Sequence, residues 1–266
     1  MKSNIESGYT TRNVDFSKIH GDHSKAFTSM ISKMNIRSGM VIGDLMGGCG
    51  GVSREILDYC NKNNLFVKIV LLDAFEEQLK KSQSFLAPYD QIGYCIQRRL
   101  EDARMMTLDS MLDSAVIKFG LHEVPQCEQP RIMRGTFKSL KEGGELYIWE
   151  IFGQTPNIHK HFRRMIKKKD KISRYNSFVQ LRYFPEESKV IEYLSNAGFR
   201  DIEVIYSGDF LSSTLHYHKF DFPNNPTALM RWNDYLRKTL PPEAKVEDTG
   251  DSINLHILKK IIKARK

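Results

Sequence analysis

A glycine-rich loop between an apolar run and a helical pattern is the feature that most constrains this fold. The apolar run 41–43 leads to Asp44, and glycines then occupy four of the five positions from 47 to 51. The helical pattern that follows carries Ser53, which is predicted to cap it. Because glycine has no Cβ and tolerates a positive φ, a ligand can approach the backbone of such a loop closely. The unit therefore predicts a ligand-binding loop at the end of a strand.

A second acid ends the next apolar run. Residues 66–72 lead to Asp73, and in nucleotide-binding folds a carboxylate in this place accepts hydrogen bonds from a ribose diol. The alternative for Asp73 is an N-cap of the following helix, and the same alternative applies to Asp44. Together, the loop and Asp73 favour an adenosine-containing ligand.

Strand and helix patterns alternate through the first 150 residues, which favours a parallel sheet with crossover helices. Further strands are expected near residues 94–97, 114–119, 145–152, 202–206 and 253–257. Helices are expected over 132–140, ended by Gly143 and Gly144, and from Pro185 to a stop at Gly198. One more helix is expected between 223 and 242, with Leu229, Trp232 and Leu236 on one side. The pattern therefore predicts an α/β fold.

Size and composition narrow the class of protein. The length of 266 residues suits one large domain, and 41% apolar with 27% charged residues is ordinary for a folded chain. No apolar run approaches the roughly 20 residues of a membrane helix, and residues 1–6 lack the apolar core of a secretory signal. The four cysteines form no CxxC pair. We therefore expect free thiols, no membrane association and a cytoplasmic location.

The positive charge is concentrated in one segment. Residues 159–174 carry eight Lys and Arg side chains against Asp170 alone, which is +7 of the chain's net +8. Phe162, Met165 and Ile166 are spaced i, i+3, i+4, so the segment is predicted to be an amphipathic helix with a basic outer face. Such a face is either simply solvated or binds an anionic partner, a small acidic substrate or RNA.

The order of these motifs resembles that of the class I S-adenosylmethionine-dependent methyltransferases over residues 35–206. The matching segments are Asp44-Leu45-Met46-Gly47-Gly48-Cys49-Gly50, Asp73, Gln97-Arg98-Arg99-Leu100-Glu101-Asp102, Phe119-Gly120-Leu121-His122-Glu123-Val124, Leu140-Lys141-Glu142-Gly143-Gly144-Glu145-Leu146 and Asn196-Ala197-Gly198-Phe199. The resemblance implies a Rossmann-like, mostly parallel seven-stranded sheet with helices on both faces. It divides a single domain, 1–266, into an N-terminal helical cap (1–37), a cofactor-binding core (38–152) and two lid insertions (153–184 and 207–250).

The resemblance also implies a cofactor, S-adenosylmethionine, with S-adenosylhomocysteine as the product. The residues that it places around the cofactor are Tyr9, Asp44, Met46, Gly47, Gly48, Gly50, Asp73, Ala74, Leu100, Glu101, Lys118 and Phe119. Two positions depart from the family pattern. Met46 stands where the first alternating glycine is usual, and Arg99 stands where many members have an aspartate that reaches the adenine amino group. Adenine recognition is then expected from the backbone near Leu100, or from Glu101 or Asp102.

Histidines are the first candidates for the chemistry. Methyl transfer is an in-line displacement that needs positioning and desolvation, and an oxygen or nitrogen nucleophile can also need a general base. His122 follows the fourth strand, where ligands bind in open α/β sheets; its alternative is a structural histidine. Glu123 could face the acceptor instead, and His23, like His20, could line the acceptor pocket from the N-terminal segment or be a surface histidine.

Two histidine pairs with i, i+2 spacing, His159 with His161 and His216 with His218, would share one face if they lay in strands. Such a pair can start a metal site. Neither pair is accompanied by a convincing carboxylate or cysteine partner, so no metal site is expected.

The acceptor is not specified by the core. Aromatic side chains are frequent in the two lid insertions, which favours a small, partly hydrophobic acceptor that is methylated on O, N or C in secondary metabolism. One alternative is an RNA methyltransferase that uses the basic helix, although no appended RNA-binding module is evident. A cofactor-binding scaffold that transfers no methyl group is another. A nicotinamide oxidoreductase is disfavoured because Arg54 and Glu55 stand where its later glycine would lie. The oligomeric state, monomer or homodimer, stays open.

Overall fold

A single central sheet organises the protein. The computed structural model describes residues 23–266, and the predictions for Tyr9 and His20 concern residues outside this range. The strands are β1 (Val41–Leu45), β2 (Lys68–Asp73), β3 (Cys95–Leu100), β4 (Leu112–Lys118), β5 (Leu140–Phe152), β6 (Arg200–Ser213), β7 (Val246–Asp248) and β8 (Ile253–Arg265). The helices are α3 (Ser24–Met34), α4 (Gly51–Lys62), α5 (Glu76–Gln91), α6 (Gln129–Ser139), α7 (Pro156–Ile172), α8 (Asn176–Leu181), α9 (Glu187–Ala197), α10 (Thr214–Asp221) and α11 (Pro226–Thr239), with 3-10 turns η1 (Ala103–Met105) and η2 (Leu121–Glu123).

The sheet has the strand order β3-β2-β1-β4-β5-β8-β6. The first five strands of that order are parallel, and β8 is antiparallel to both β5 and β6. Residues 69–72 of β2 and 115–117 of β4 are fully buried, as expected for strands covered on both faces. The expected α/β fold with a mostly parallel sheet is confirmed. Within residues 23–266 the sheet has eight strands rather than the expected seven, because the short β7 also pairs with β8.

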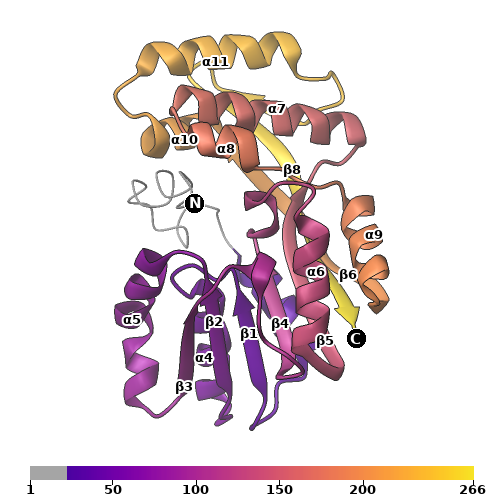
Figure 1. The fold of residues 1–266 in the computed structure, drawn as a ribbon. Coiled ribbons are helices and arrows are strands. Elements are labelled where there is room, and N and C mark those ends of the chain that lie inside the picture. The colour runs from indigo at the N-terminus through magenta and orange to yellow at the C-terminus, as the bar shows by residue number, and fades with distance from the viewer. Residues whose placement is uncertain (1–22) are drawn as a thin grey trace.

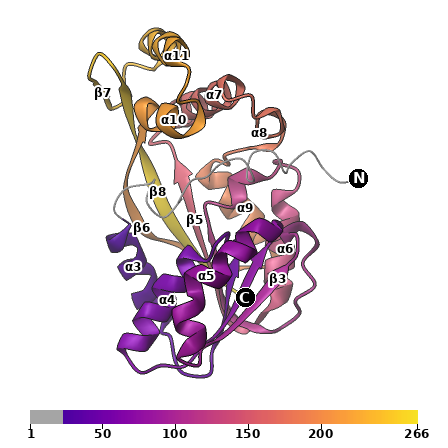
Figure 2. The same cartoon turned by 90° about the vertical axis from the view of Figure 1, so that its left-hand side faces the viewer.

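Helices cover both faces of the sheet. Figure 2 shows α3, α4 and α5 together on one face, where their apolar side chains pack with Tyr147 and Trp149 of β5. On the other face, α6 and α9 pack with Ile148 of β5 and Ile262 of β8. Both faces of β5 and β8 are therefore buried, which places the main core along the middle of the sheet.

A helical lid lies above the carboxyl ends of the parallel strands. Figure 1 shows α7, α8, α10 and α11 at this end, with β6 and β8 running up into them. A third core joins α7 and α11 to Phe210 of β6 and Ile257 of β8. Within the expected lid insertion at 207–250, residues 207–213 continue β6, and α10, α11 and β7 follow. Alternation around Gly208 and the serines after it is too weak to reveal this strand.

The lid's basic helix forms as its pattern predicts. The side chain of Thr155 accepts a hydrogen bond from the backbone N–H of Ile158, and Pro156 occupies the first turn. Phe162, Met165 and Ile166 are buried. The expected helix that ends at Gly198 is also present, because Gly198 adopts a φ of 103° after α9.

Two local expectations are wrong. Ser53 does not cap α4; the cap position is Gly50, and Ser53 lies inside the first turn. The glycines at 143 and 144 do not end a helix, because α6 ends at Ser139 and residues 140–144 already belong to β5. The histidine pairs lie on helices, His159 with His161 on α7 and His216 with His218 on α10. The i, i+2 spacing in a helix turns the two side chains of each pair to different sides.

No helix within residues 23–266 is long and apolar enough to cross a bilayer.

Candidate functional site

The glycine loop connects β1 to α4 through a tight turn. Gly48 and Gly50 have φ values of 57° and 88°, which favour glycine. A Cβ at Gly47 would lie 2.5 Å from Leu71 and 2.6 Å from Asp44, so a side chain there would displace the loop. A Cβ at Gly48 would meet nothing closer than Gln78 Oε1 at 3.8 Å. The loop is thus packed on its inner side and approachable at Gly48.

Asp44 supports this loop from below. Its Oδ2 accepts hydrogen bonds from the Ser53 backbone N–H at 3.0 Å and from the Ser53 hydroxyl at 2.7 Å. Burial raises the pKa of Asp44 to about 6, although the two Ser53 hydrogen bonds oppose the rise. Asp44 therefore holds the first turn of α4 through Ser53, although the N-cap position itself is Gly50, and contact between Asp44 and the cofactor stays a prediction.

Asp73 ties the end of β2 to the same loop. Its Oδ2 accepts the Gly48 backbone N–H at 2.8 Å, and its Oδ1 accepts the Phe75 N–H at 2.9 Å. It does not cap α5, since the cap position is Phe75 and no side chain caps that helix. Burial raises the pKa of this carboxyl, and the backbone hydrogen bonds oppose that rise. A carboxylate has about four acceptor positions, so the backbone hydrogen bonds from Gly48, Phe75 and Ala74 leave one with which to accept from a diol.

Two apolar residues, Ala74 and Leu100, lie next to Asp73 at the carboxyl ends of β2 and β3. Ala74 is exposed, and Leu100, the last residue of β3, is 60% exposed. Glu101 is occupied locally, because it accepts hydrogen bonds from Arg99 Nε at 2.9 Å and from the backbone N–H of Thr107. Arg99 thus turns toward Glu101. Together, Ala74 and Leu100 offer a flat apolar surface to an aromatic base, with Glu101 held beside it.

Two neighbouring strands end in residues with unusual backbone angles. Met46 after β1 and Phe119 after β4 have φ values of 58° and 54°, and this left-handed region is costly for residues other than glycine. The Met46 side chain packs against Gly120, where an added Cβ would lie 2.8 Å from Met46 Cβ. Such conformations cluster at functional sites when the surrounding structure holds them. In this structure the two residues, Met46 and Phe119, lie at the carboxyl ends of β1 and β4, between the glycine loop and the lid.

Lys118 and His23 lie beside Phe119 on the α3 face. The ammonium of Lys118 is 5.2 Å from the ring centre of Trp149 and 5.4 Å from that of Phe27. His23 precedes α3 and is buried, with its ring 5.1 Å from that of Trp149. The surface alternative for His23 is therefore wrong, and its catalytic assignment stays a prediction.

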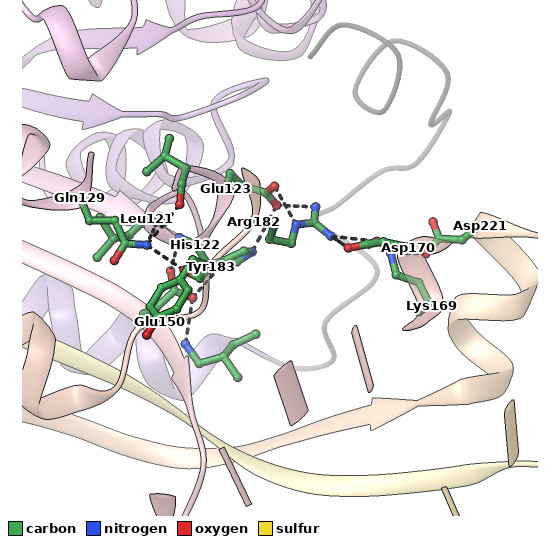
Figure 3. Close-up of polar contacts among 12 residues, drawn as sticks. Leu121, His122, Glu123, Gln129, Glu150, Lys169, Asp170, Arg182, Tyr183 and Asp221 are labelled. Carbon is green, nitrogen blue, oxygen red and sulfur yellow. Dashed lines mark hydrogen bonds and ion pairs between the residues drawn. The ribbon is translucent and has the colours of Figure 1, made fainter. Parts of the chain in front are cut away.

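His122 is held between two carboxylates (Figure 3). Its Nδ1 lies 2.7 Å from Oε1 of Glu150, and its Nε2 lies 3.2 Å from Oε1 of Glu123. Burial disfavours the charged ring, but Glu150 and Glu123 outweigh it and raise the pKa of His122 to about 9. The ring also stacks on Phe184 at 4.2 Å. Near neutral pH the ring is an imidazolium whose two N–H groups are both engaged, so a general-base role stays a prediction that requires a proton to leave first.

Glu123 continues this arrangement into the lid. Arg182 donates to Glu123 through Nε at 2.9 Å and through an Nη atom at 2.7 Å, and it also contacts Asp170 at 3.3 Å. Lys169 then lies 2.5 Å from Asp170 and 3.0 Å from Asp221 of α10. Seven alternating charges therefore run from β5 into the lid as one buried ion network, as Figure 3 shows.

Backbone contacts fix the same junction. The Tyr183 N–H donates to the His122 carbonyl at 2.9 Å, and Gln129 Nε2 donates to the Tyr183 carbonyl at 2.7 Å. Sequence reasoning identified His122 and Glu123 but missed Glu150 and Arg182, which lie far from them in the chain. The one local indication of a buried ion network was Asp170, the single acidic residue in the basic segment 159–174.

Comparisons with known proteins agree with this architecture. A model of the ubiE/COQ5 methyltransferase family matches residues 3–210. A search among curated proteins gave no match in sequence. Among solved structures, a putative methyltransferase from Bacillus halodurans C-125 superposes with a TM-score of 0.72 at 17% identity, covering 91% of this chain and 99% of that one.

Two further solved structures share the fold with different functions. The [4+2]-cyclase SpnF has a TM-score of 0.58 at 16% identity, over 91% of this chain and 80% of its own. Phosphoethanolamine N-methyltransferase 2 from Haemonchus contortus, in complex with phosphomonomethylethanolamine and S-adenosylhomocysteine, has a TM-score of 0.57 at 14% identity, over 91% of this chain and 52% of its own. At these identities the likeness concerns the fold alone.

Proposed function

The chain belongs to the ubiE/COQ5 methyltransferase family, and from this premise we propose that it transfers the methyl group of S-adenosylmethionine to a small, partly hydrophobic acceptor beneath the lid. The observation that carries the proposal is the junction of the glycine loop with Asp73. The Gly48 N–H is fixed by the Asp73 carboxylate at 2.8 Å, so one rigid unit presents both the open backbone and the acid.

The residues present fit this cofactor. Asp73 has an acceptor position left for a ribose diol, and Ala74 with Leu100 offers an apolar surface to adenine. The open side of Gly48 leaves room for the aminoacyl portion, next to Met46, Lys118 and Phe119. When bound, the cofactor supplies an electrophilic methyl group on a positively charged sulfur. The chain's own contribution is to orient the two reactants and to exclude water under the lid.

The acceptor proposal rests on the walls around Lys118 and Phe119. Phe119 contacts the rings of Trp149 at 5.7 Å and Phe210 at 6.2 Å, so the lid and the sheet meet here through aromatic surfaces. Such surfaces suit a small acceptor with an apolar body, as in secondary metabolism. The free cysteines fit a reducing compartment, and we propose a cytoplasmic location.

RNA methylation is the second candidate, and one observation favours it. Lys160, Arg164, Lys167 and Lys171 are exposed and spaced i, i+4, i+7, i+11 along α7, which places them on one helix face. A polyanion would bind there with a strong salt dependence. Affinity for a mixed-sequence RNA that falls steeply with salt, and that is lost when these residues are changed, would favour this candidate over a small acceptor.

Binding of S-adenosylhomocysteine tests the cofactor assignment. We expect S-adenosylmethionine and S-adenosylhomocysteine to raise the melting temperature, and NADH to have no effect. A ligand that binds only the folded protein adds about 2.7 kcal/mol to the free energy of unfolding when its concentration is 100 times Kd. Asp73→Ala should weaken S-adenosylhomocysteine at least tenfold in calorimetric titration, about 1.4 kcal/mol.

Asp109→Ala is the matched control, because Asp109 is exposed and lies before β4, at the opposite edge of the sheet. Stabilisation by NADH alone would remove the proposal. An Asp73→Ala variant that stays folded and binds as well as the parent would remove the ribose contact.

A further inference from the structure

Two helices of the lid, α7 and α11, pack against each other in opposite directions. Figure 1 shows α11 lying along α7. Near the start of α7, Asn157 Nδ2 donates to Oε1 of Glu243, which follows α11, at 2.8 Å. Further along α7, the Lys168 ammonium lies 3.5 Å from the ring centre of Tyr235. Residue numbers rise along one helix as they fall along the other, so the helices are antiparallel.

Four exposed cations surround the contact between Lys168 and Tyr235, and they are Arg164 and Lys171 of α7 with Arg231 and Lys238 of α11. Each lies three or four residues from the contact along its own helix, which places it on the same side of the helix as the contact. Because the helices are antiparallel, Arg164 and Lys238 lie on one side of the contact. Lys171 and Arg231 lie on the other.

The cations form two rows with the same interval. Arg164 and Lys171 are seven residues apart in α7. Arg231 and Lys238 are also seven residues apart, in α11. Seven residues make two helical turns, about 10 Å, and a helix that packs along another presents its charged side chains at this same interval. The two rows therefore match the spacing of a third helix laid along the line where α7 and α11 meet.

The acidic residues of these two helices are engaged elsewhere. Asp170 binds Lys169 within the lid, and Asp234 binds Arg237. Among residues 23–266, none of the four cations is in an ion pair with a carboxylate. Like charges gathered on one surface repel each other, and carboxylates of a partner that lie over them remove this repulsion and steer the partner to the surface.

We propose that the four cations form a docking site for an acidic helix of a partner protein, laid along the line where α7 and α11 meet. The inference goes beyond methyl transfer, because the site faces away from the acceptor. Arg164 is two residues from Phe162, which is buried in the core of the lid, so the two side chains lie on opposite sides of α7. The partner helix would carry Asp or Glu at seven-residue intervals in two neighbouring rows.

Single-stranded RNA suits this surface less well than an acidic helix. Proteins bind the bases of single-stranded RNA by stacking them on aromatic side chains. The Arg163 guanidinium lies 4.7 Å from the ring centre of Tyr183, and Lys168 covers the ring of Tyr235. A base would have to displace a cation of the surface before it could stack on either ring.

A lipid surface and a second copy of the chain also match poorly. Helices that lie in a membrane interface insert large apolar side chains, but none of the exposed large apolar residues among 23–266 belongs to α7. Met230 of α11 is seven residues from Arg237 and shares its side of the helix, where Arg237 binds Asp248 of β7. Two copies of a chain with a net charge of +8 repel each other.

Fluorescence anisotropy with a labelled peptide tests the proposal. The probe is an alanine-rich peptide of about 20 residues, long enough to be helical, with glutamates at seven-residue intervals in two neighbouring rows. Its control has the same composition, with the glutamates spread around the helix. At about 0.15 M salt, we expect the probe to bind at least tenfold more tightly than the control. Equal binding would show that net charge alone matters and would overturn the proposal.

Paired substitutions locate the site. Arg164→Gln with Lys171→Gln, and Arg231→Gln with Lys238→Gln, should each weaken the probe at least tenfold. Lys33→Gln with Lys62→Gln is the matched control, because it removes two exposed charges from α3 and α4; it should change the affinity by less than twofold. All these side chains are exposed, so each variant should fold and bind S-adenosylhomocysteine as the parent does.

Three other outcomes would overturn the proposal. An effect of the α7 pair without an effect of the α11 pair would confine binding to one helix. Tighter binding of a mixed-sequence RNA oligonucleotide than of the probe, in the same buffer, would assign the surface to nucleic acid. Tighter binding to phosphatidylserine vesicles than to the probe would assign it to a membrane.

Discussion

At the scale of single residues, the neighbours of His122 determine its charge state. The ring lies between Glu150, which is fully buried, and Glu123, which Arg182 also binds. This environment favours the imidazolium form, and the charged ring then holds η2 in place under the lid through Glu123 and Glu150. The charge state of one ring is therefore linked to the packing of the junction around it.

His122 makes stability depend on pH in a defined window. Its pKa is about 9 in the folded protein against an ordinary value near 6.5, so the stabilisation is complete below about pH 6.5 and is lost as the pH rises through 9. The parent should therefore be more stable than His122→Gln at pH 6.5, and this difference in the free energy of unfolding should shrink by about 3 kcal/mol as the pH rises above 9. Urea denaturation at pH 6.5, 8 and 9.5 measures this difference, and a difference that is constant with pH would contradict it.

At the scale of elements, α7 combines an exposed basic face with a buried charge. Lys169 is 1% exposed and lies between Asp170 and Asp221, while Lys167, two residues earlier, is exposed. Removing one member of a buried ion network leaves the others without their counter-charge, which typically costs 3–5 kcal/mol. The lysine thus fixes α10 against α7.

Lys169→Met should therefore destabilise the protein by about 3 kcal/mol, whereas Lys167→Met should change stability by less than about 0.5 kcal/mol. Denaturant titration of both variants beside the parent gives the comparison. Equal stabilities for the two variants would show that the buried network contributes little to the lid.

The elements also show which parts of the molecule the sequence could predict. The loop at Gly48 and the acid Asp73 were predictable because each is a local pattern with a local cause. The partners of His122 were not, since Glu150 and Arg182 are brought to it by the sheet and the lid. Lys169 continues the i, i+3, i+4 spacing of the buried apolar residues of α7 as the i+7 position, so the helix register indicated its burial, whereas its partner Asp221 lies on another element. The extension of β6 to Ser213 was hidden by its mixed small and polar residues.

At the scale of the whole molecule, the lid is built on strands that belong to the core. The ladder between β6 and β8 has register shifts between residues 200 and 206, and it is then regular from Tyr206 with Ile261 to Ser213 with Asn254. Figure 1 shows both strands entering the lid. Phe210 and Ile257 on these strands belong to the lid's apolar core. A hinge between core and lid would have to break this ladder, so access to the site is expected through local movement of α8 and the residues after it.

Hydrogen exchange tests this expectation. Peptides of β6 and β8 within the lid should be protected about as well as β8 peptides in the core, whereas α8 should exchange faster and slow down when S-adenosylhomocysteine is bound. Peptides from β1 and β4 give the reference for global unfolding. Exchange of the upper β6 and β8 peptides in step with α8 would instead indicate a hinged lid.

The insertion of β8 between β5 and β6 also bears on how the chain folds. Strand β6 follows β5 in the sequence, yet in the part of the chain that the structure describes it pairs with β8, which comes later still. Among the strands of residues 23–266, β8 is therefore the one that must form before β6 can join the sheet beside β5. Contacts such as Ile148 with Ile262 join distant parts of the chain and so raise the contact order, which slows folding. The parallel strands can assemble early, but completion of the sheet, and with it the lid, must wait for this one late strand.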